Sequence, residues 1–156
     1  KEYHYKDMAA DVICFIESLH IEKPVLCGFS DGAIITLLVA LKRQDLLSAI
    51  VLCGANLSPK GLTGSARREI KSLYTQTNSP LVEMMLLEPD IAPDKLRSIN
   101  LPALVCAGSK DMIKPKETQT IADPLPQATL HIFEGETHRS YVEHTDKLAP
   151  VLRKFL

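Results

Sequence analysis

A serine held between two glycines is the first group in this sequence that could do chemistry. Residues 28–32 read Gly-Phe-Ser-Asp-Gly, which fits the pattern G-x-S-x-G with Ser30 at its centre. The bare pattern occurs by chance in roughly 5% of chains of this length, so its surroundings must decide. A short apolar run, Val25 to Cys27, ends just before it, and an apolar segment, Ala33 to Leu41, follows. A strand, a sharp turn and a helix in that order are typical of a serine nucleophile.

The turn around Ser30 explains the residue types in this pattern. A serine at the tip of a strand-to-helix turn sits in a strained backbone conformation, and Gly28 and Gly32 are expected to let the strand and the helix approach each other. The first N–H groups of the helix and its positive dipole end then point toward the reacting oxygen. We therefore predict that the backbone N–H of Asp31 stabilises an oxyanion. The carboxylate of Asp31 suits a structural role at a helix start equally well.

A serine is a weak nucleophile unless a neighbouring base takes its proton. Asp111 follows an apolar run at residues 103–107, and His138 follows another at residues 129–133. If these runs are parallel strands, both side chains lie at the carboxyl edge of the sheet, as Ser30 does. The sequence thus predicts Ser30 as nucleophile, His138 as general base and Asp111 as the acid that orients the histidine.

Each of these partners has an alternative. Asp111 could merely cap the turn in which it lies. His144 follows His138 by six residues and stands beside Glu143. We favour His138 as the base, because His144 lies closer to the final helical segment.

The elements that must position these residues alternate along the chain. Apolar stripes predict helices at residues 7–20, 33–41, 66–74, 81–87, 115–122 and 145–156, and short apolar runs predict strands at 25–27, 49–53, 103–107 and 129–133. Strands that alternate with helices imply right-handed crossovers. We predict an α/β fold with a predominantly parallel sheet of about four strands and flanking helices.

The composition limits the class of protein. The 156 residues are 46% hydrophobic and 24% charged, with a net charge of −1, so neither nucleic acid nor a membrane is an expected partner. No apolar stretch approaches the roughly 20 residues that span a bilayer. The four cysteines lie in apolar runs without metal-type spacing, which predicts buried, reduced thiols and a cytoplasmic protein. No metal or organic cofactor is expected.

From about Tyr5 onward, the chain resembles the C-terminal portion of a small cap-bearing serine hydrolase of the α/β-hydrolase fold superfamily. The segments that carry this resemblance are DMAADVICFIESL, GFSDG, VLCGANLSPKGL, LPALVCAGSKDMI and GETHRSYVEH. The resemblance implies a carboxylesterase-like enzyme that cleaves an ester-like bond of a small acyl substrate without a cofactor. It assigns the nucleophile to Ser30, the acid to Asp111 and the base to His138. Thr137 and Ala33 stand where the family often has glycine.

The resemblance also predicts how the chain is divided. Residues 1–156 would form one domain that lacks the N-terminal strands of the family, and residues 56–100 would form a reduced cap. The sequence contains no His-Gly pair of the kind that often supplies a second oxyanion donor. The strand at residues 25–27 would then be an unpaired edge, which predicts a homo-oligomer or a completing chain at that edge.

Two kinds of function remain open at this point. Esterases, thioesterases, C–C bond hydrolases and cofactor-free haloperoxidases all use the same template, so the resemblance does not choose among them. The alternative of a different class is a non-catalytic fragment or interaction protein, which keeps the triad residues but lacks a complete oxyanion hole.

Overall fold

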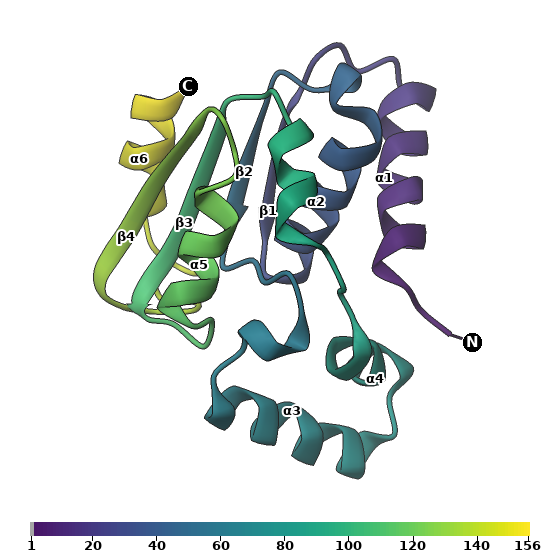
Figure 1. The fold of residues 1–156 in the computed structure, drawn as a ribbon, viewed down its shortest axis with the longest axis vertical. Coiled ribbons are helices and arrows are strands. Elements are labelled where there is room, and N and C mark those ends of the chain that lie inside the picture. The colour runs from purple at the N-terminus through teal and green to yellow at the C-terminus, as the bar shows by residue number, and fades with distance from the viewer. Residues whose placement is uncertain (1) are drawn as a thin grey trace.

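The computed structural model describes residues 2–156. Its four strands form one parallel sheet, as the alternating pattern predicted, and their order in the sheet is β1-β2-β3-β4. The strands are β1 (Val25–Phe29), β2 (Ala49–Cys53), β3 (Ala103–Lys110) and β4 (Ala128–Thr137). Because all four run in the same direction, their carboxyl ends lie along one edge of the sheet (Figure 1).

The helices cover the two faces of the sheet unequally. Three of them lie on one face: α1 (Tyr5–Ser18), α2 (Asp31–Arg43) and α5 (Pro115–Ala122). The last helix, α6 (Leu148–Phe155), lies on the opposite face (Figure 1). A short 3₁₀ turn, η1 (Gln44–Leu46), follows α2. Successive right-handed crossovers place their helices on the same side, which accounts for this distribution.

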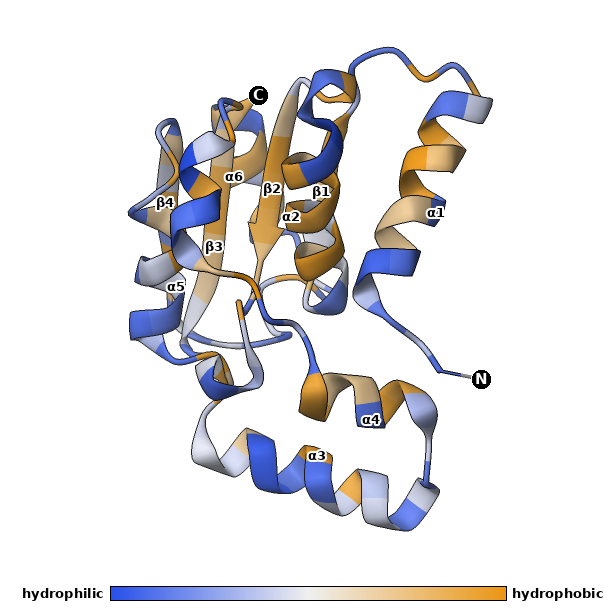
Figure 2. Ribbon diagram, turned by 45° about the vertical axis from the view of Figure 1, so that its right-hand side comes forward, coloured by the Kyte–Doolittle hydropathy of each residue, from blue (hydrophilic) through white to orange (hydrophobic). Residues whose placement is uncertain are grey.

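The core follows the same division. The face under α1, α2 and α5 carries the larger apolar cluster, in which Leu37 and Ile50 are completely buried. The face under α6 carries a smaller cluster built from Val51, Cys53, Leu104, Cys106, Phe133 and Tyr141. In Figure 2, β2 and α2 are mostly hydrophobic, whereas α3 is mostly hydrophilic. The main core therefore lies between the sheet and the helices α1, α2 and α5.

The margin of the sheet at β1 is less well covered. Within the part of the chain that the structure describes, β1 pairs only with β2. Val25 is 37% exposed, and Cys27 is exposed as well. The prediction of buried thiols is correct for Cys53 and Cys106 and wrong for Cys14 and Cys27. Cys14 lies on a solvent-facing side of α1, and Cys27 lies on β1, whose outer edge is unpaired within residues 2–156.

The segment 56–100 lies beyond the carboxyl edge of the sheet as far as residue 88 (Figures 1 and 2), and its last residues return along the helix face of the sheet beside α2 and α5. It contains η2 (Pro59–Gly61), α3 (Gly64–Thr77), α4 (Pro80–Leu87) and η3 (Pro93–Ser98). The hydroxyl of Thr63 caps α3 by accepting a hydrogen bond from the N–H of Ala66 at 3.3 Å. A small apolar cluster that includes Leu62, Ile70 and Ile113 attaches the segment to the loop after β3. None of the helices within residues 2–156 is long and apolar enough to cross a membrane.

Candidate active site

Ser30 occupies a strained turn between β1 and α2. Its backbone φ is 54° and its ψ is −119°, a conformation that a non-glycine residue rarely adopts. A Cβ atom on Gly28 would lie 2.1 Å from the carbonyl oxygen of Gly32, so only glycine fits at position 28. A Cβ atom on Gly32 would meet nothing within 4 Å. The prediction that both glycines make room is therefore right for Gly28 and wrong for Gly32.

The register of the sheet brings Asp111 and His138 together. Lys110 at the end of β3 pairs with Thr137 at the end of β4, so the next residue of each strand leaves the sheet at the same level. The Nδ1 atom of His138 lies 2.7 Å from Oδ1 of Asp111. Two separate segments, far apart in sequence, thus meet because of one strand pairing.

Hydrogen bonds hold the carboxylate of Asp111 in place. Its Oδ2 atom accepts from the N–H of Gly108 at 3.1 Å, and its Oδ1 atom accepts from the N–H of Ile113 at 2.9 Å. The side chain is only 1% exposed. A buried carboxylate with these donors is fixed in orientation, and His138 supplies its remaining partner.

His138 faces Ser30 with its other ring nitrogen. The Nε2 atom lies 3.0 Å from Oγ of Ser30, and the side chain of His138 is 11% exposed. Phe29 packs against the ring, with 4.9 Å between ring centroids. On another side, a Cβ atom on Gly54 would lie 2.6 Å from Cε1 of His138. Gly54, which also has a positive φ of 65°, therefore leaves the space that the imidazole occupies.

The loop that carries His138 is braced by polar contacts that the sequence did not reveal. The hydroxyl of Ser140 accepts from the N–H of Thr137 at 2.9 Å and donates to Glu136 at 2.6 Å. Lys147 donates to the other oxygen of Glu136, also at 2.6 Å. The hydrogen bond from Lys147 is the main cause that lowers the pKa of Glu136. These contacts fix the chain on both sides of the histidine.

Asp31 combines two features. It is the first residue of α2, and its backbone N–H has no acceptor among the contacts of residues 2–156. Its carboxylate accepts a hydrogen bond from the phenol of Tyr5 at 2.8 Å. Burial, followed by the charge of Asp31, raises the pKa of Tyr5, so the phenol stays protonated and donates. The N–H is thus available to a ligand, while the side chain has a structural partner.

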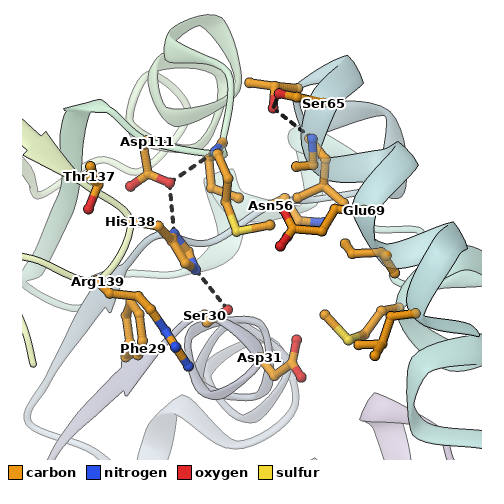
Figure 3. A pocket seen from close by; sticks show the side chains of 18 of the residues that line it. Phe29, Ser30, Asp31, Asn56, Ser65, Glu69, Asp111, Thr137, His138 and Arg139 are labelled. Atoms are coloured by element: carbon orange, nitrogen blue, oxygen red, sulfur yellow. Dashed lines mark hydrogen bonds and ion pairs between the residues drawn. The ribbon is translucent and has the colours of Figure 1, made fainter. Parts of the chain in front are cut away.

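Ser30, Asp31, Asp111 and His138 border a cavity of about 760 Å³ that lies between the sheet edge and the segment 56–100. Figure 3 shows Ser30, His138 and Asp111 in one row, with Asn56 and Glu69 across from them. The apolar lining comes mostly from the segment 56–100 and the loop after β3, with one residue from the end of β1, and it includes Phe29, Leu62, Ala66, Ile70, Leu73, Met85, Met112 and Ile113. Three more carboxylates besides Asp111 also line the cavity, those of Asp31, Glu69 and Glu88.

The remaining sequence candidates can be placed as well. His144 is exposed and does not line the cavity, so the structure brings His138 and not His144 to the serine. Nowhere in residues 2–156 do three His, Cys, Asp or Glu side chains gather in a way that could hold a metal ion.

Comparison with known proteins places the chain in a family. The family model for the alpha/beta hydrolase fold matches residues 1–83, more than half of the chain. The chain therefore belongs to the α/β-hydrolase fold family, in agreement with the resemblance seen in the sequence.

Relatives of known sequence match different shares of the chain. The proline iminopeptidase of Lactobacillus helveticus is 35% identical over 63 residues, which cover 40% of this chain and 21% of that protein. The matched part of the chain thus spans about a fifth of the length of that relative. The uncharacterized hydrolase YugF of Bacillus subtilis is 24% identical over 198 positions, which cover 99% of this chain and 72% of YugF.

Solved structures agree on the fold. A hydrolase from Oleispira antarctica superposes with a TM-score of 0.80 at 17% identity, and the match covers 97% of this chain and 71% of that protein. At this level of identity the likeness concerns the fold alone.

Proposed function

We propose that this protein is a serine hydrolase that cleaves an ester-like acyl bond, with Ser30 as nucleophile, His138 as general base and Asp111 as the orienting acid. The observation that carries the proposal is the continuous row of contacts from Ser30 Oγ to His138 Nε2 at 3.0 Å and from His138 Nδ1 to Asp111 Oδ1 at 2.7 Å. Both distances suit hydrogen bonds through which a proton can pass. Membership of the α/β-hydrolase fold family supports the same chemistry.

In the first half of the reaction, Ser30 becomes acylated. Its Oγ forms a bond to the substrate carbonyl carbon while its proton passes to Nε2 of His138. The carbonyl oxygen gains a negative charge, and the N–H of Asp31 is positioned at the helix start to stabilise it. When the tetrahedral intermediate collapses, the bond to the leaving group breaks, and His138 gives its proton to the departing oxygen.

In the second half, water replaces the leaving group. His138 takes a proton from the water, whose oxygen bonds to the acyl carbon, and then returns the proton to Ser30 Oγ as the acyl–serine bond breaks. The carboxylate of Asp111 holds the Nδ1 proton throughout and stabilises the imidazolium that forms twice per cycle. The fixed orientation of Asp111 supports this role, because hydrogen bonds from two backbone N–H groups hold its carboxylate so that Oδ1 faces the imidazole ring.

The segment 56–100 serves as a reduced cap in this proposal. It supplies most of the apolar lining opposite Ser30 and so would contact the acyl or leaving group. The alignment with YugF runs over 198 positions, more than the 156 residues of this chain, so YugF contains residues in the matched region that have no counterpart here. A cap that is shorter than in this relative agrees with that difference.

An activity-based probe tests the proposal directly. A fluorophosphonate should label the protein stoichiometrically, and mass spectrometry should locate the adduct on Ser30, because only an activated serine reacts quickly with this electrophile. Asp31→Asn should label normally and serves as a matched control beside the nucleophile. Absence of labelling in the folded protein would favour the non-catalytic alternative.

A second candidate concerns substrates with an amino group. Asp31, Glu69 and Glu88 line the cavity near Ser30 together with Asp111, so four carboxylates face the two cations of the lining, Lys110 and Arg139. A proline iminopeptidase is among the relatives. Carboxylates around a cavity favour a cationic ligand, so we propose aminoacyl esters or amides as a substrate class. The test compares the kcat/KM for an alanine aryl ester with that for its N-acetylated form. A preference for the acetylated ester would contradict this candidate.

We further propose that the open margin at β1 associates with another chain or with a second copy of this one. Val25 and Cys27 leave apolar and thiol surface in water on a strand whose outer edge is unpaired within the described residues. Sedimentation velocity should show association that rises with concentration, and Val25→Lys should weaken it. Leu87→Lys removes an equally apolar side chain that is 71% exposed elsewhere and should leave association unchanged. A monomer at every concentration would count against self-association.

A further inference from the structure

A second hollow lies outside the catalytic cavity, between α1, α2 and η3. Its volume is about 830 Å³, which falls within the range of roughly 300–1,000 Å³ that is common for small-molecule sites. We call it the basic groove, and it is lined by Lys6, Ala9, Leu38, Leu41, Lys42, Asp94, Lys95, Arg97 and Ser98. None of these residues lines the catalytic cavity, so the groove is not an extension of it.

The floor of the basic groove is apolar. Ala9 projects from α1 and is 2% exposed. Leu38 and Leu41 are partly buried and stand three residues apart on α2, so they share one face of that helix. The α1 and α2 helices pack side by side (Figure 1), which brings the two parts of the floor together. An alkyl chain laid on this floor would exchange water for apolar contacts.

The rim of the basic groove is positively charged. Lys6 comes from α1 and Lys42 from α2, whereas Lys95 and Arg97 come from η3. Among residues 2–156, no carboxylate lies within ion-pair distance of any of the three lysines. The groove therefore gathers uncompensated cations on a chain whose net charge is −1.

The single acid of the groove does not neutralise it. Asp94 lies 3.6 Å from the guanidinium of Arg97, and the two side chains are 93% and 70% exposed. A pair that is so exposed contributes little energy, so Arg97 can turn to an incoming anion at little cost. Four cations then face one carboxylate around the hollow.

We infer that the basic groove binds a single-chain amphiphile with an anionic head group, in the form of a free medium-chain carboxylate. The alkyl chain would lie on Leu38 and Leu41, and the head group would reach the cations of the rim. The stems of the lysines are themselves apolar and extend the floor upward. The hollow shape and short floor suit one free ligand better than a membrane surface, which needs a projecting apolar face.

Calorimetric titration of the unmodified protein tests this inference with sodium decanoate as the probe, at concentrations below its micelle point. We expect decanoate to bind more tightly than octanoate, with a gain of roughly fourfold for each methylene that becomes buried. Decyltrimethylammonium has the same chain with a cationic head and should not bind. Raising the NaCl concentration from about 50 to about 500 mM should weaken decanoate binding, because salt screens the rim.

Charge reversal locates the site. The double variant Lys42→Glu, Lys95→Glu should bind decanoate about tenfold more weakly, since it removes two cations and adds two anions at the rim. The double variant Lys71→Glu, Lys154→Glu makes the same change in net charge on exposed residues outside the groove and should bind normally. Equal weakening in both variants would overturn the inference, as would equal binding of the cationic detergent. Binding to anionic vesicles without any binding of decanoate would overturn it as well.

Discussion

One wall of the catalytic cavity is the carboxyl edge of the sheet, and the opposite wall is the segment 56–100. The sheet wall holds Asp111 at 1% exposure with backbone donors on both oxygens, and it holds Ser30 in a strained turn. The wall formed by 56–100 carries exposed side chains such as Glu69 and Leu73. Packing thus fixes the arrangement of the sheet wall, whereas the exposed positions of the other wall can vary with little effect on it. In an α/β fold, a division of this kind places the reacting groups on one wall and the side chains that select the substrate on the other.

The largest loss of kcat should come from substitutions in the sheet wall. Ser30→Ala and His138→Ala should each lower kcat for a short-chain aryl ester by about 10⁶, and the double variant should lose little more, because triad members act as a unit. Thermal melts should change little for Ser30→Ala, which removes one hydroxyl and relieves no packing. Steady-state kinetics on the three variants measures this. Retention of wild-type turnover by Ser30→Ala would refute the assignment.

Substitution of Asp111 and of Asp31, two carboxylates of the cavity, should lower kcat to extents that differ by orders of magnitude. Asp111→Asn should lower kcat by about 10⁴, since an amide presents a donor to Nδ1 and favours the wrong tautomer. Asp31→Asn keeps the backbone N–H and an oxygen that can accept from Tyr5, so its kcat should fall by less than about tenfold. The two substitutions are matched in chemistry, and both residues line the cavity. If Asp31→Asn proved the more damaging, the acid would have been assigned to the wrong residue.

The wall formed by 56–100 should affect substrate choice and not turnover. Glu69→Gln should raise KM for an alanine aryl ester by about three- to fivefold, the scale of an exposed charge contact. It should leave kcat and the KM for the acetylated ester unchanged. Asp90→Asn removes the same charge from an exposed residue outside the cavity and is the control. A fall in kcat for both esters would mean that Glu69 supports the sheet wall after all.

The functional residues of the sheet wall could be predicted from the sequence, because Ser30, Asp111 and His138 each follow the end of a strand. The predicted bounds of the strand at 49–53 and the helix at 115–122 match β2 and α5. The predicted strand at 129–133 is too short, since β4 runs on through Gly135 to Thr137 and pairs with β3 beyond an irregularity at residues 108–110. Glycine is typical of turns, so Gly135, which has a positive φ of 78°, indicated in the sequence that the strand had ended. Only the pairing with β3 shows that the strand continues.

Other features depend on contacts that no local pattern encodes. The final helix begins at Leu148 and not at residue 145, because the preceding chain forms the braced loop that returns from His138. The hydrogen bond from Tyr5 to Asp31 joins residues 26 apart in sequence. The cavity-facing position of Glu69 depends on how α3 docks over the sheet edge. Spacing within one element predicts none of these.

The smallest expected effect concerns a contact between the start of α1 and the end of α4. His4, just before α1, contacts Glu88, just after α4, with 2.5 Å between Nδ1 and Oε1, and the N–H of Tyr5 donates to the same carboxylate. The hydrogen bond to Glu88 is the main cause that raises the pKa of His4. A raised pKa in the folded state means that this contact stabilises the fold fully at pH values below the ordinary histidine pKa of about 6.5, and that the contribution is lost as pH rises through the folded value.

His4→Gln should therefore be less stable than the wild type near pH 5.5 and almost equally stable near pH 8.5, a range that brackets the ordinary pKa of about 6.5. Urea unfolding at the two pH values measures the difference. The change should be small, since both side chains are partly exposed. His144→Gln alters an exposed histidine outside the cavity and should show no such dependence on pH. A stability difference that grew with rising pH would have the wrong sign for a contact that needs the protonated ring. In that case the contact between His4 and Glu88 would not be what holds α4 to the start of α1.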